Sequence, residues 1–144
     1  MSYGQVFLIL LAMILFSTIY LTTYNSLYDQ ADMAYKGMNL LNGQKVTDKF
    51  FQKIEADLLG QIMPFDAIQS TYNNQVDSVT IGDFTYFADF STTPCTMTGA
   101  DTTTADPEFI RIDISIWAVH PNGDTLWIGT QEHPLSKVFV DLYI

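Results

Sequence analysis

The chain begins MSYGQVFLILLAMILFSTIYLTTYNSLYDQ (residues 1–30), and this stretch decides how the rest of the fold can be built. It contains no charged side chain before Asp29, and residues 6–21 are almost entirely apolar. Residues 29–144 hold all sixteen carboxylates and all six cationic side chains of a chain whose formal net charge is −10. A helix that is apolar on every side must be buried in lipid or in protein. The sequence therefore divides into an apolar first part and an acidic second part.

Residues 5–24 have the length and polarity of a transmembrane helix, which needs about 20 predominantly apolar residues. The Ser and Thr hydroxyls in this segment interrupt it only mildly, because each can bond to the backbone carbonyl one turn earlier. Tyr3 at one end and Tyr20, Tyr24 and Tyr28 at the other are typical of the aromatic belts at a membrane surface. A secretory signal peptide fits less well, since residues 1–5 contain no Lys or Arg and no Ala-x-Ala pattern follows. The segment is interpreted as a helix that spans a membrane or forms the interior of an assembly.

The helical pattern continues beyond the apolar segment. Residues 26–38 contain no Pro, and their apolar positions recur at the spacing of one helical stripe. The pair Asn42-Gly43 predicts a weak point or a turn. Thr47 is then expected as the N-cap of an amphipathic run that Gly60 ends. We expect one helix, or two nearly coaxial pieces, of more than about 50 residues.

From Val76 onward the pattern changes to the alternation of half-buried strands. Residues 110–118 alternate apolar and mostly polar side chains and predict a strand. Residues 121–124 carry the Asn-Gly signal of a hairpin turn, and residues 125–130 are the expected partner strand. Residues 131–135, which include a Pro, are expected to form a loop.

Three further segments complete this part of the chain. Residues 78–81 and 84–90 predict a second hairpin. The Thr-rich residues 91–106 are low in apolar content and are expected to form a surface loop. The final strand is expected over residues 137–144, and its alternation places four apolar side chains on one face. These four are Val138, Val140, Leu142 and Ile144.

The predicted fold class is α+β. A long N-terminal helix, apolar in its first half and amphipathic in its second, packs on a small antiparallel sheet of four or five strands. The expected organisation is a hydrophobic transmembrane or filament-core helix at residues 1–28 and its amphipathic continuation at residues 29–60. An antiparallel β head follows at residues 61–144.

Few residues are candidates for chemistry. His120 lies at an expected turn and His133 in an expected loop, and a zinc site would need three or four ligands at characteristic spacing. Asp101 and Asp106 lack the alternating acidic pattern of an EF-hand loop. Cys95 is the single cysteine, so no intrachain disulfide forms, and no His lies near it to activate the thiol. We therefore expect no catalytic residue, no metal and no cofactor, and the acidic net charge argues against nucleic acid as a partner.

In this order of elements, and in its first 25 or so residues, the chain resembles the type IV pilin superfamily. The family includes bacterial pilins, pseudopilins of type II secretion systems, and archaeal pilins and flagellins. The resemblance implies a lollipop-like subunit whose mature N-terminus follows cleavage of a short leader. Met1 is then the N-methylated first residue, or Gln5 is the mature terminus after Gly4, and both possibilities stay open. With Met1 first, Gln5 stands where the family has a glutamate that pairs with a neighbouring subunit's terminal amine, and it offers a neutral hydrogen bond instead.

The resemblance also implies a function. The chain would be the structural subunit of an extracellular filament on the cell surface, held in the cytoplasmic membrane before assembly. Its partners would be further copies of itself, the membrane and the pilus assembly machinery. The implied contact residues of the membrane and filament-core helix are Met1, Gln5, Phe7, Leu8, Leu10, Leu11, Met13, Ile14 and Phe16.

Two alternatives remain beside the filament subunit. One is a membrane-anchored minor pilin or pseudopilin that primes or caps an assembly or secretion machine. The other is a single-pass anchored binding domain that never polymerises. Bacterial or archaeal origin, the adhesion target, retraction, helical symmetry and glycosylation of the Thr-rich loop are left open by the sequence.

Overall fold

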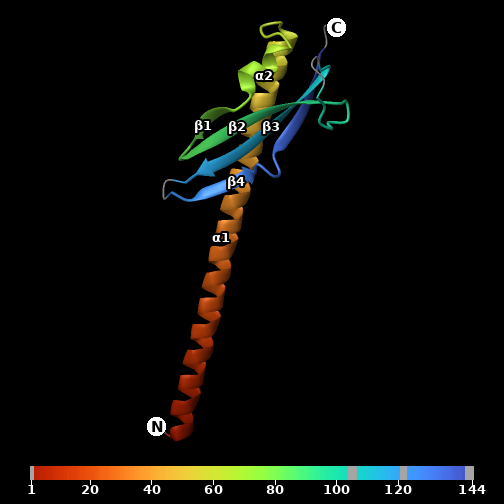
Figure 1. Cartoon of the computed structure of the whole chain (residues 1–144). Coiled ribbons are helices and arrows are strands. Elements are labelled where there is room, and N and C mark those ends of the chain that lie inside the picture. The colour runs from red at the N-terminus through yellow and green to blue at the C-terminus, as the bar shows by residue number, and fades with distance from the viewer. Residues whose placement is uncertain (1, 104–106, 121–122, 142–144) are drawn as a thin grey trace. The chain divides into compact units, whose positions relative to one another are not determined.

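The computed structural model describes residues 2–103, 107–120 and 123–141 (Figure 1). Contacts between residues divide the chain into two compact units, residues 1–38 and residues 39–144. The boundary predicted at residue 28 marks a change of polarity, and the one at residue 60 marks the end of the helix. The division after Met38 instead reflects contacts between residues. The two kinds of boundary therefore describe different properties of the same chain.

Helix α1 runs from Tyr3 to Leu59, so the prediction of a helix longer than 50 residues is confirmed by its 57 residues. Gly60 follows directly, as predicted, and its N–H donates to the Ala56 carbonyl at 2.9 Å. A turn at Asn42-Gly43, one of the two possibilities predicted there, is wrong, because both residues are helical. Thr47 is likewise not an N-cap. It lies inside the helix, where its hydroxyl donates to the Gly43 carbonyl at 3.1 Å, the local bond that lets Thr sit in a helix interior.

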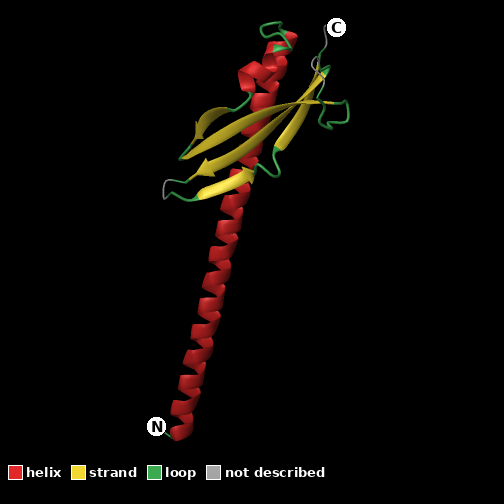
Figure 2. Cartoon of the chain, in the orientation of Figure 1, coloured by secondary structure: helices red, strands yellow, loops and turns green. Residues whose placement is uncertain are grey.

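The second unit contains a five-stranded antiparallel sheet on the last part of α1 (Figure 2). Its strands are β1 (Gln75–Ile81), β2 (Phe84–Cys95), β3 (Phe109–Val119), β4 (Thr125–Gly129) and β5 (Leu135–Val140). The order is β1-β2-β3-β4, and β5 pairs with the free part of β3 next to β4. This arrangement confirms the predicted α+β fold class. A short helix, α2 (Ala67–Tyr72), was not predicted.

Both predicted hairpins are present, and the strand limits differ at two places. The hairpin of β1 and β2 turns at Gly82, whose φ of 61° suits Gly. The predicted loop over residues 91–106 is wrong at its start, because β2 continues to Cys95. Pro94 is tolerated there because β1 pairs with β2 only as far as Phe90. The residues of β2 beyond Phe90 therefore lie at the sheet edge. The β3–β4 hairpin pairs Val119 with Thr125, while residues 121–122 and 104–106 lie outside the described residues.

The last strand begins at Leu135, two residues earlier than predicted, and the described strand ends at Val140. Val138 and Val140 share a face, as the alternation predicts, but that face is exposed. Phe139, on the opposite face, enters the core with 5% of its surface exposed. Leu142 and Ile144 lie outside the described residues.

The core lies between the sheet and the Asn39–Leu59 part of α1, which in Figure 1 passes behind the strands. Alternate residues of β3, from Ile110 to Ala118, point into it together with Tyr86, Ala88 and Phe90 of β2. The helix contributes Val46, Phe51 and Ile54. Burying a side chain of this size stabilises a fold by about 1.5–3 kcal/mol relative to leaving it exposed. The head therefore holds together by packing, as a chain with one cysteine must.

Candidate functional site

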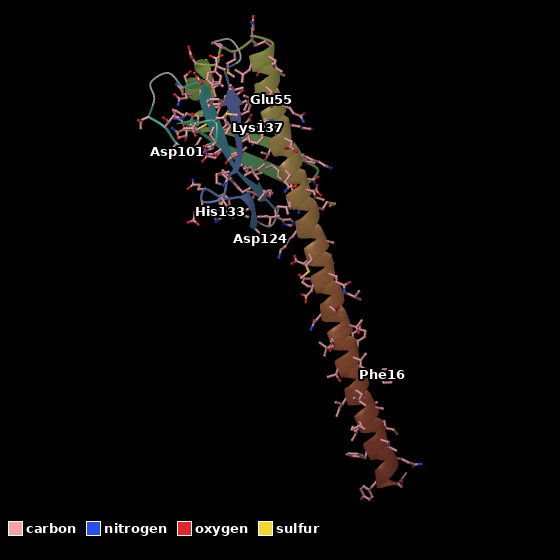
Figure 3. The ribbon with its side chains drawn as sticks, turned by 90° about the vertical axis from the view of Figure 1, so that its right-hand side faces the viewer. Phe16, Glu55, Asp101, Asp124, His133 and Lys137 are labelled. Atoms are coloured by element: carbon pink, nitrogen blue, oxygen red, sulfur yellow. The ribbon has the colours of Figure 1, made fainter. Side chains whose placement is uncertain are left out.

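The apolar surface of α1 before Met38 is the first candidate site. None of the residues 3–38 is buried. The most apolar 18-residue segment of α1, with a mean hydropathy of 2.3, is exposed throughout. The predicted contact residues are exposed by between 45% (Leu11) and 77% (Phe16) of their surface, and Figure 3 shows Phe16 projecting from the ribbon. The others are Phe7, Leu8, Leu10, Met13 and Ile14. Met1 lies outside the described residues.

Gln5 lies at the start of α1, where its side-chain oxygen accepts a hydrogen bond from the Ser2 N–H at 3.3 Å. The first N–H groups of a helix have no partner within the helix backbone, and a Gln three residues along the chain can satisfy one of them. In the single chain, Gln5 therefore supports the end of its own helix. Its side-chain N–H groups make no hydrogen bond that the structure shows, so they are able to donate to another group.

Two hydroxyls within the apolar segment, those of Thr18 and Thr22, bond to the helix backbone as predicted. The Thr18 hydroxyl donates to the Ile14 carbonyl at 2.6 Å, and the Thr22 hydroxyl donates to the Thr18 carbonyl at 2.8 Å. Such bonds remove the need for water around these hydroxyls. By length and composition, this part of α1 can cross a membrane.

Exposed apolar residues continue beyond the length that a membrane covers. Residues 3–38 extend about 54 Å at about 1.5 Å per residue, whereas the hydrocarbon core of a bilayer is about 30 Å thick. After residue 24, Leu27, Met33 and Met38 are each exposed by more than half of their surface. They alternate with charged groups, among them the Lys36–Asp32 ion pair at 2.7 Å. This second stretch therefore exposes apolar side chains beside charged ones, beyond the segment that a membrane would cover.

In the head, two of the residues considered for chemistry take structural roles. Asp101 accepts a hydrogen bond from Arg111 at 2.7 Å, and Arg111 also binds both oxygens of Asp113, at 3.0 and 2.9 Å. This hydrogen bond to Asp113 is the main cause that raises the pKa of Arg111. Cys95 is buried beside this cluster, and burial raises the pKa of its thiol, which disfavours the reactive thiolate. Asp106 lies outside the described residues.

The two histidines do not converge on these groups. His133 is exposed in the loop before β5, and Figure 3 shows it at a different place on the head from Asp101. The His120 ring is half-buried, with its centroid 5.3 Å from that of Phe84. Among the described residues, no group of three or more His, Cys, Asp or Glu side chains is placed to hold a metal ion.

An open groove of about 480 Å³ lies at the end of α1, beside β5. Leu58, Met63 and Phe65 contribute apolar lining, and Glu55 lines it as well. Glu55 is bound to Lys137 at 2.7 Å, as the two labelled side chains in Figure 3 indicate. The groove therefore presents mainly an apolar surface.

One feature of the head was missed in the sequence, a row of three aromatic rings on the face of the sheet opposite α1. Phe87 of β2, Trp117 of β3 and Trp127 of β4 stand opposite one another in the strand register. The ring centroids of Phe87 and Trp117 are 5.7 Å apart, and those of Trp117 and Trp127 are 5.1 Å apart. The Asn-Gly hairpin signal pointed to the Trp117–Trp127 pairing, since a short turn brings residues at equal distances from it together.

Comparisons of the chain with models of protein families, with curated proteins and with solved structures found no match.

Proposed function

We propose that the chain is the structural subunit of an extracellular pilus-like filament, in which the apolar surface of α1 is buried against the same surface of neighbouring copies. The observation that carries the proposal is the extent of this surface. It is exposed on all sides over residues 3–38, and it continues past the length that lipid covers.

Before assembly, lipid is a suitable environment for residues 5–24. A helix satisfies its own backbone groups, and the Thr18 and Thr22 hydroxyls are bonded within it. Moving such a helix from lipid to protein gains no hydrophobic free energy, because lipid tails are as apolar as Leu. Close packing between helices, at small residues such as Ala12 and Ser17, would have to supply the attraction there.

The residues beyond the membrane supply a different driving force. Leu27, Met33 and Met38 face water in an unassembled subunit, so their burial against another copy gains about 25 cal/mol per Å² of apolar surface. This part of α1 would therefore favour association once two subunits lie side by side. Repetition of one such contact, with a rotation that does not close, produces an open helical filament.

The second candidate is a subunit that stays in the membrane, as a minor pilin, a pseudopilin or an anchored binding domain. Residues 5–24 alone favour it, because a single helix of this length is sufficient as an anchor. This candidate gives no role to the exposed apolar residues beyond the membrane. The Met33 side chain, which is 72% exposed, therefore distinguishes the two functions.

The test is negative-stain microscopy of the sheared surface fraction from producing cells, with mass spectrometry of the N-terminal peptide. We expect fibres with this chain as the main component, beginning at methylated Met1 or at Gln5. Met33→Glu should lower the fibre yield at least about tenfold without changing the amount of chain in the membrane, because it buries a charge at the helix contact. Met97→Glu is the matched control, since Met97 is 81% exposed on a loop of the head.

Two results would contradict the proposal. A wild-type chain found only in the membrane, with no fibres, would support the anchored subunit. Fibres from Met33→Glu in normal yield would show that α1 beyond the membrane makes no contact in the fibre.

A further inference from the structure

The part of α1 that packs on the sheet carries three lysines on its exposed side. Lys45, Lys49 and Lys53 recur every four residues, so they lie along one side of the helix over about 12 Å. All three are exposed, and none forms an ion pair with a residue that the structure describes. The other two cations of the second unit, Arg111 and Lys137, are both ion-paired. These three lysines, the lysine row, therefore hold the unpaired cationic charge among the described residues of this unit.

An apolar side chain extends the lysine row by one turn. Leu41 lies four residues before Lys45 and is 58% exposed. The long hydrocarbon stem of a lysine packs on apolar surface while its ammonium group stays in polar surroundings. The row is therefore suited to a partner surface that is both apolar and acidic.

The groove at the end of α1 is a surface of this kind. Beside its apolar lining, three carboxylates line it, those of Glu55, Asp66 and Asp141. Lys137 is bound to Glu55, as the labelled pair in Figure 3 indicates. Asp66 is exposed and forms no ion pair with a described residue. The groove therefore keeps a negative charge next to its apolar surface.

The lysine row and the groove lie on different sides of α1. At about 100° per residue, Glu55 lies about 120° and Leu58 about 180° around the helix from Lys49. One copy of the chain can therefore use both surfaces at once. A contact between two different surfaces of the same chain is heterologous, and its repetition gives an open polymer where the rotation does not close.

The charges around the lysine row select among partners. Asp48, Glu55 and Asp57 lie on the same part of α1, which thus has as many carboxylates as lysines. A nucleic acid or an anionic membrane surface would meet both signs, and its binding needs clustered cations. Copies of a chain with a net charge of −10 repel one another, and a contact that joins opposite charges offsets this repulsion. A second copy is the partner that these observations favour.

We propose that the lysine row of one copy docks on the groove of the next copy. Leu41 and the lysine stems cover the apolar lining, and the ammonium groups bind the carboxylates of Asp66 and Asp141. This contact rests on the proposed filament, in which every subunit has neighbours of the same sequence. It adds a charged contact between heads to the apolar contact made by the first part of α1.

The first test is cross-linking of fibres from the sheared surface fraction with a water-soluble carbodiimide, which joins lysines to carboxylates that touch them. We expect cross-linked peptides between the lysine row and Asp66 or Asp141 in fibres, and none in chains dispersed in detergent. The Glu55–Lys137 pair, with an N–O distance of 2.7 Å, is the internal control, because it should cross-link in both samples.

Charge variants give a second test. Lys49→Gln should lower the fibre yield about threefold or more, whereas Met97→Glu, which changes the net charge equally on an exposed loop, should not. Lys49→Glu should lower the yield further, and adding Asp66→Lys to the same chain should restore it, because the exchanged charges attract again. Lys49 and Asp66 are both exposed, so urea unfolding of the dispersed variants, followed by near-UV circular dichroism, should match the wild type.

The results that would overturn this contact differ from those that would contradict the filament. Wild-type fibres in which Glu55 joins Lys137, but the lysine row joins neither Asp66 nor Asp141, would exclude the contact and leave the filament standing. So would a double variant with the yield of Lys49→Glu alone, equal cross-linking in dispersed chains, or cross-links from the row to a different protein only. An absence of wild-type fibres would contradict the proposed function and this contact together.

Discussion

Helix α1 has two parts with the same backbone and opposite surroundings. In residues 3–38 no side chain is buried, although this part contains the most apolar sequence of the chain. In the part from Asn39 to Leu59, six residues are buried, and three of them are Asn39, Gly43 and Thr47. Burial within this chain therefore follows the presence of a partner surface rather than hydrophobicity. No side chain of residues 3–38 is buried by the part of the chain that the structure describes, and this is why we propose lipid and other copies as the surroundings of this segment.

The Asn39–Leu59 part of α1 packs on the sheet through a buried hydrogen bond and a close contact at a glycine. The Asn39 side-chain oxygen accepts a hydrogen bond from the Tyr86 hydroxyl at 3.1 Å, with both residues almost completely buried. Gly43 lies against Ile128 of β4, where any side chain would take up the space of the Ile. Small and polar residues fix the position of the helix on the sheet, and Val46, Phe51 and Ile54 supply the apolar contact.

The largest expected difference in the free energy of unfolding is between alanine substitutions at a buried and at an exposed isoleucine. Ile114 is fully buried in β3, so Ile114→Ala removes packed atoms and should lower the free energy of unfolding by about 2–5 kcal/mol. Ile14 is 64% exposed on the apolar part of α1, and Ile14→Ala should leave head unfolding unchanged. Urea unfolding of the full chain in detergent micelles, followed by the near-UV signal of the two tryptophans, measures both.

Equal losses for the two variants would contradict the comparison. They would mean that residues 3–38 take part in the cooperative unit that unfolds with the head.

Alanine substitution at two helical glycines should give a smaller difference in stability, one glycine serving as the control for the other. A Cβ added at Gly43 would meet Ile128, at 3.1 Å from Cγ1 and closer still to Cδ1. Such overpacking costs about 1–3 kcal/mol, partly offset by about 0.5–1 kcal/mol from replacing Gly in a helix. Gly43→Ala should therefore lower the urea midpoint, whereas Gly37→Ala, with open space around it, should not.

The contact with Ile128 can be tested by a double variant. Ile128→Val removes the Cδ1 atom, so Gly43→Ala should cost less in that background than in the wild type. An unchanged cost would mean that Gly43 is needed for another reason.

Much of the fold could be predicted from the sequence because its signals are local. The missing Pro and the apolar spacing predict α1, and the alternation of residues 110–118 predicts β3. The possible turn at Asn42-Gly43 is absent because Gly43 makes room for Ile128, about 85 residues further on, and no local pattern records such a contact. β2 was predicted too short because residues 91–106 are Thr-rich and low in apolar content, and the edge position that tolerates Pro94 becomes visible only with the strand order.

The candidate sites differ in the same way. The exposed apolar residues of α1 could be named from the sequence, since apolar side chains without charge are visible there, and their role in contacts stays a prediction. The aromatic row was missed because it depends on the register of three strands, and Phe87 is 30 residues from Trp117. Period-two alternation places each ring on a face, but only the pairing of β2 with β3 and of β3 with β4 brings the three together.

The smallest effect concerns two ion pairs of equal length, Lys36–Asp32 in the first unit and Lys137–Glu55 in the head, each with an N–O distance of 2.7 Å. Lys36–Asp32 is fully open to solvent and should add little to stability, while the partly exposed Lys137–Glu55 pair is worth at most about 1 kcal/mol. Asp32→Asn should leave head unfolding unchanged, and Glu55→Gln should lower the free energy of unfolding by about 0.5 kcal/mol or less.

Lys137→Gln should cost more than Glu55→Gln, because the Lys137 ammonium also lies 5.8 and 5.9 Å from the ring centroids of Phe51 and Phe139, contacts worth about 0.5–1 kcal/mol. Urea midpoints at low salt and at about 1 M salt separate the two contributions, since the Debye length falls to about 3 Å and screens the exposed pair first. The reverse order, with Glu55→Gln the costlier change, would show that the ion pair rather than the ring contact fixes Lys137 on the head.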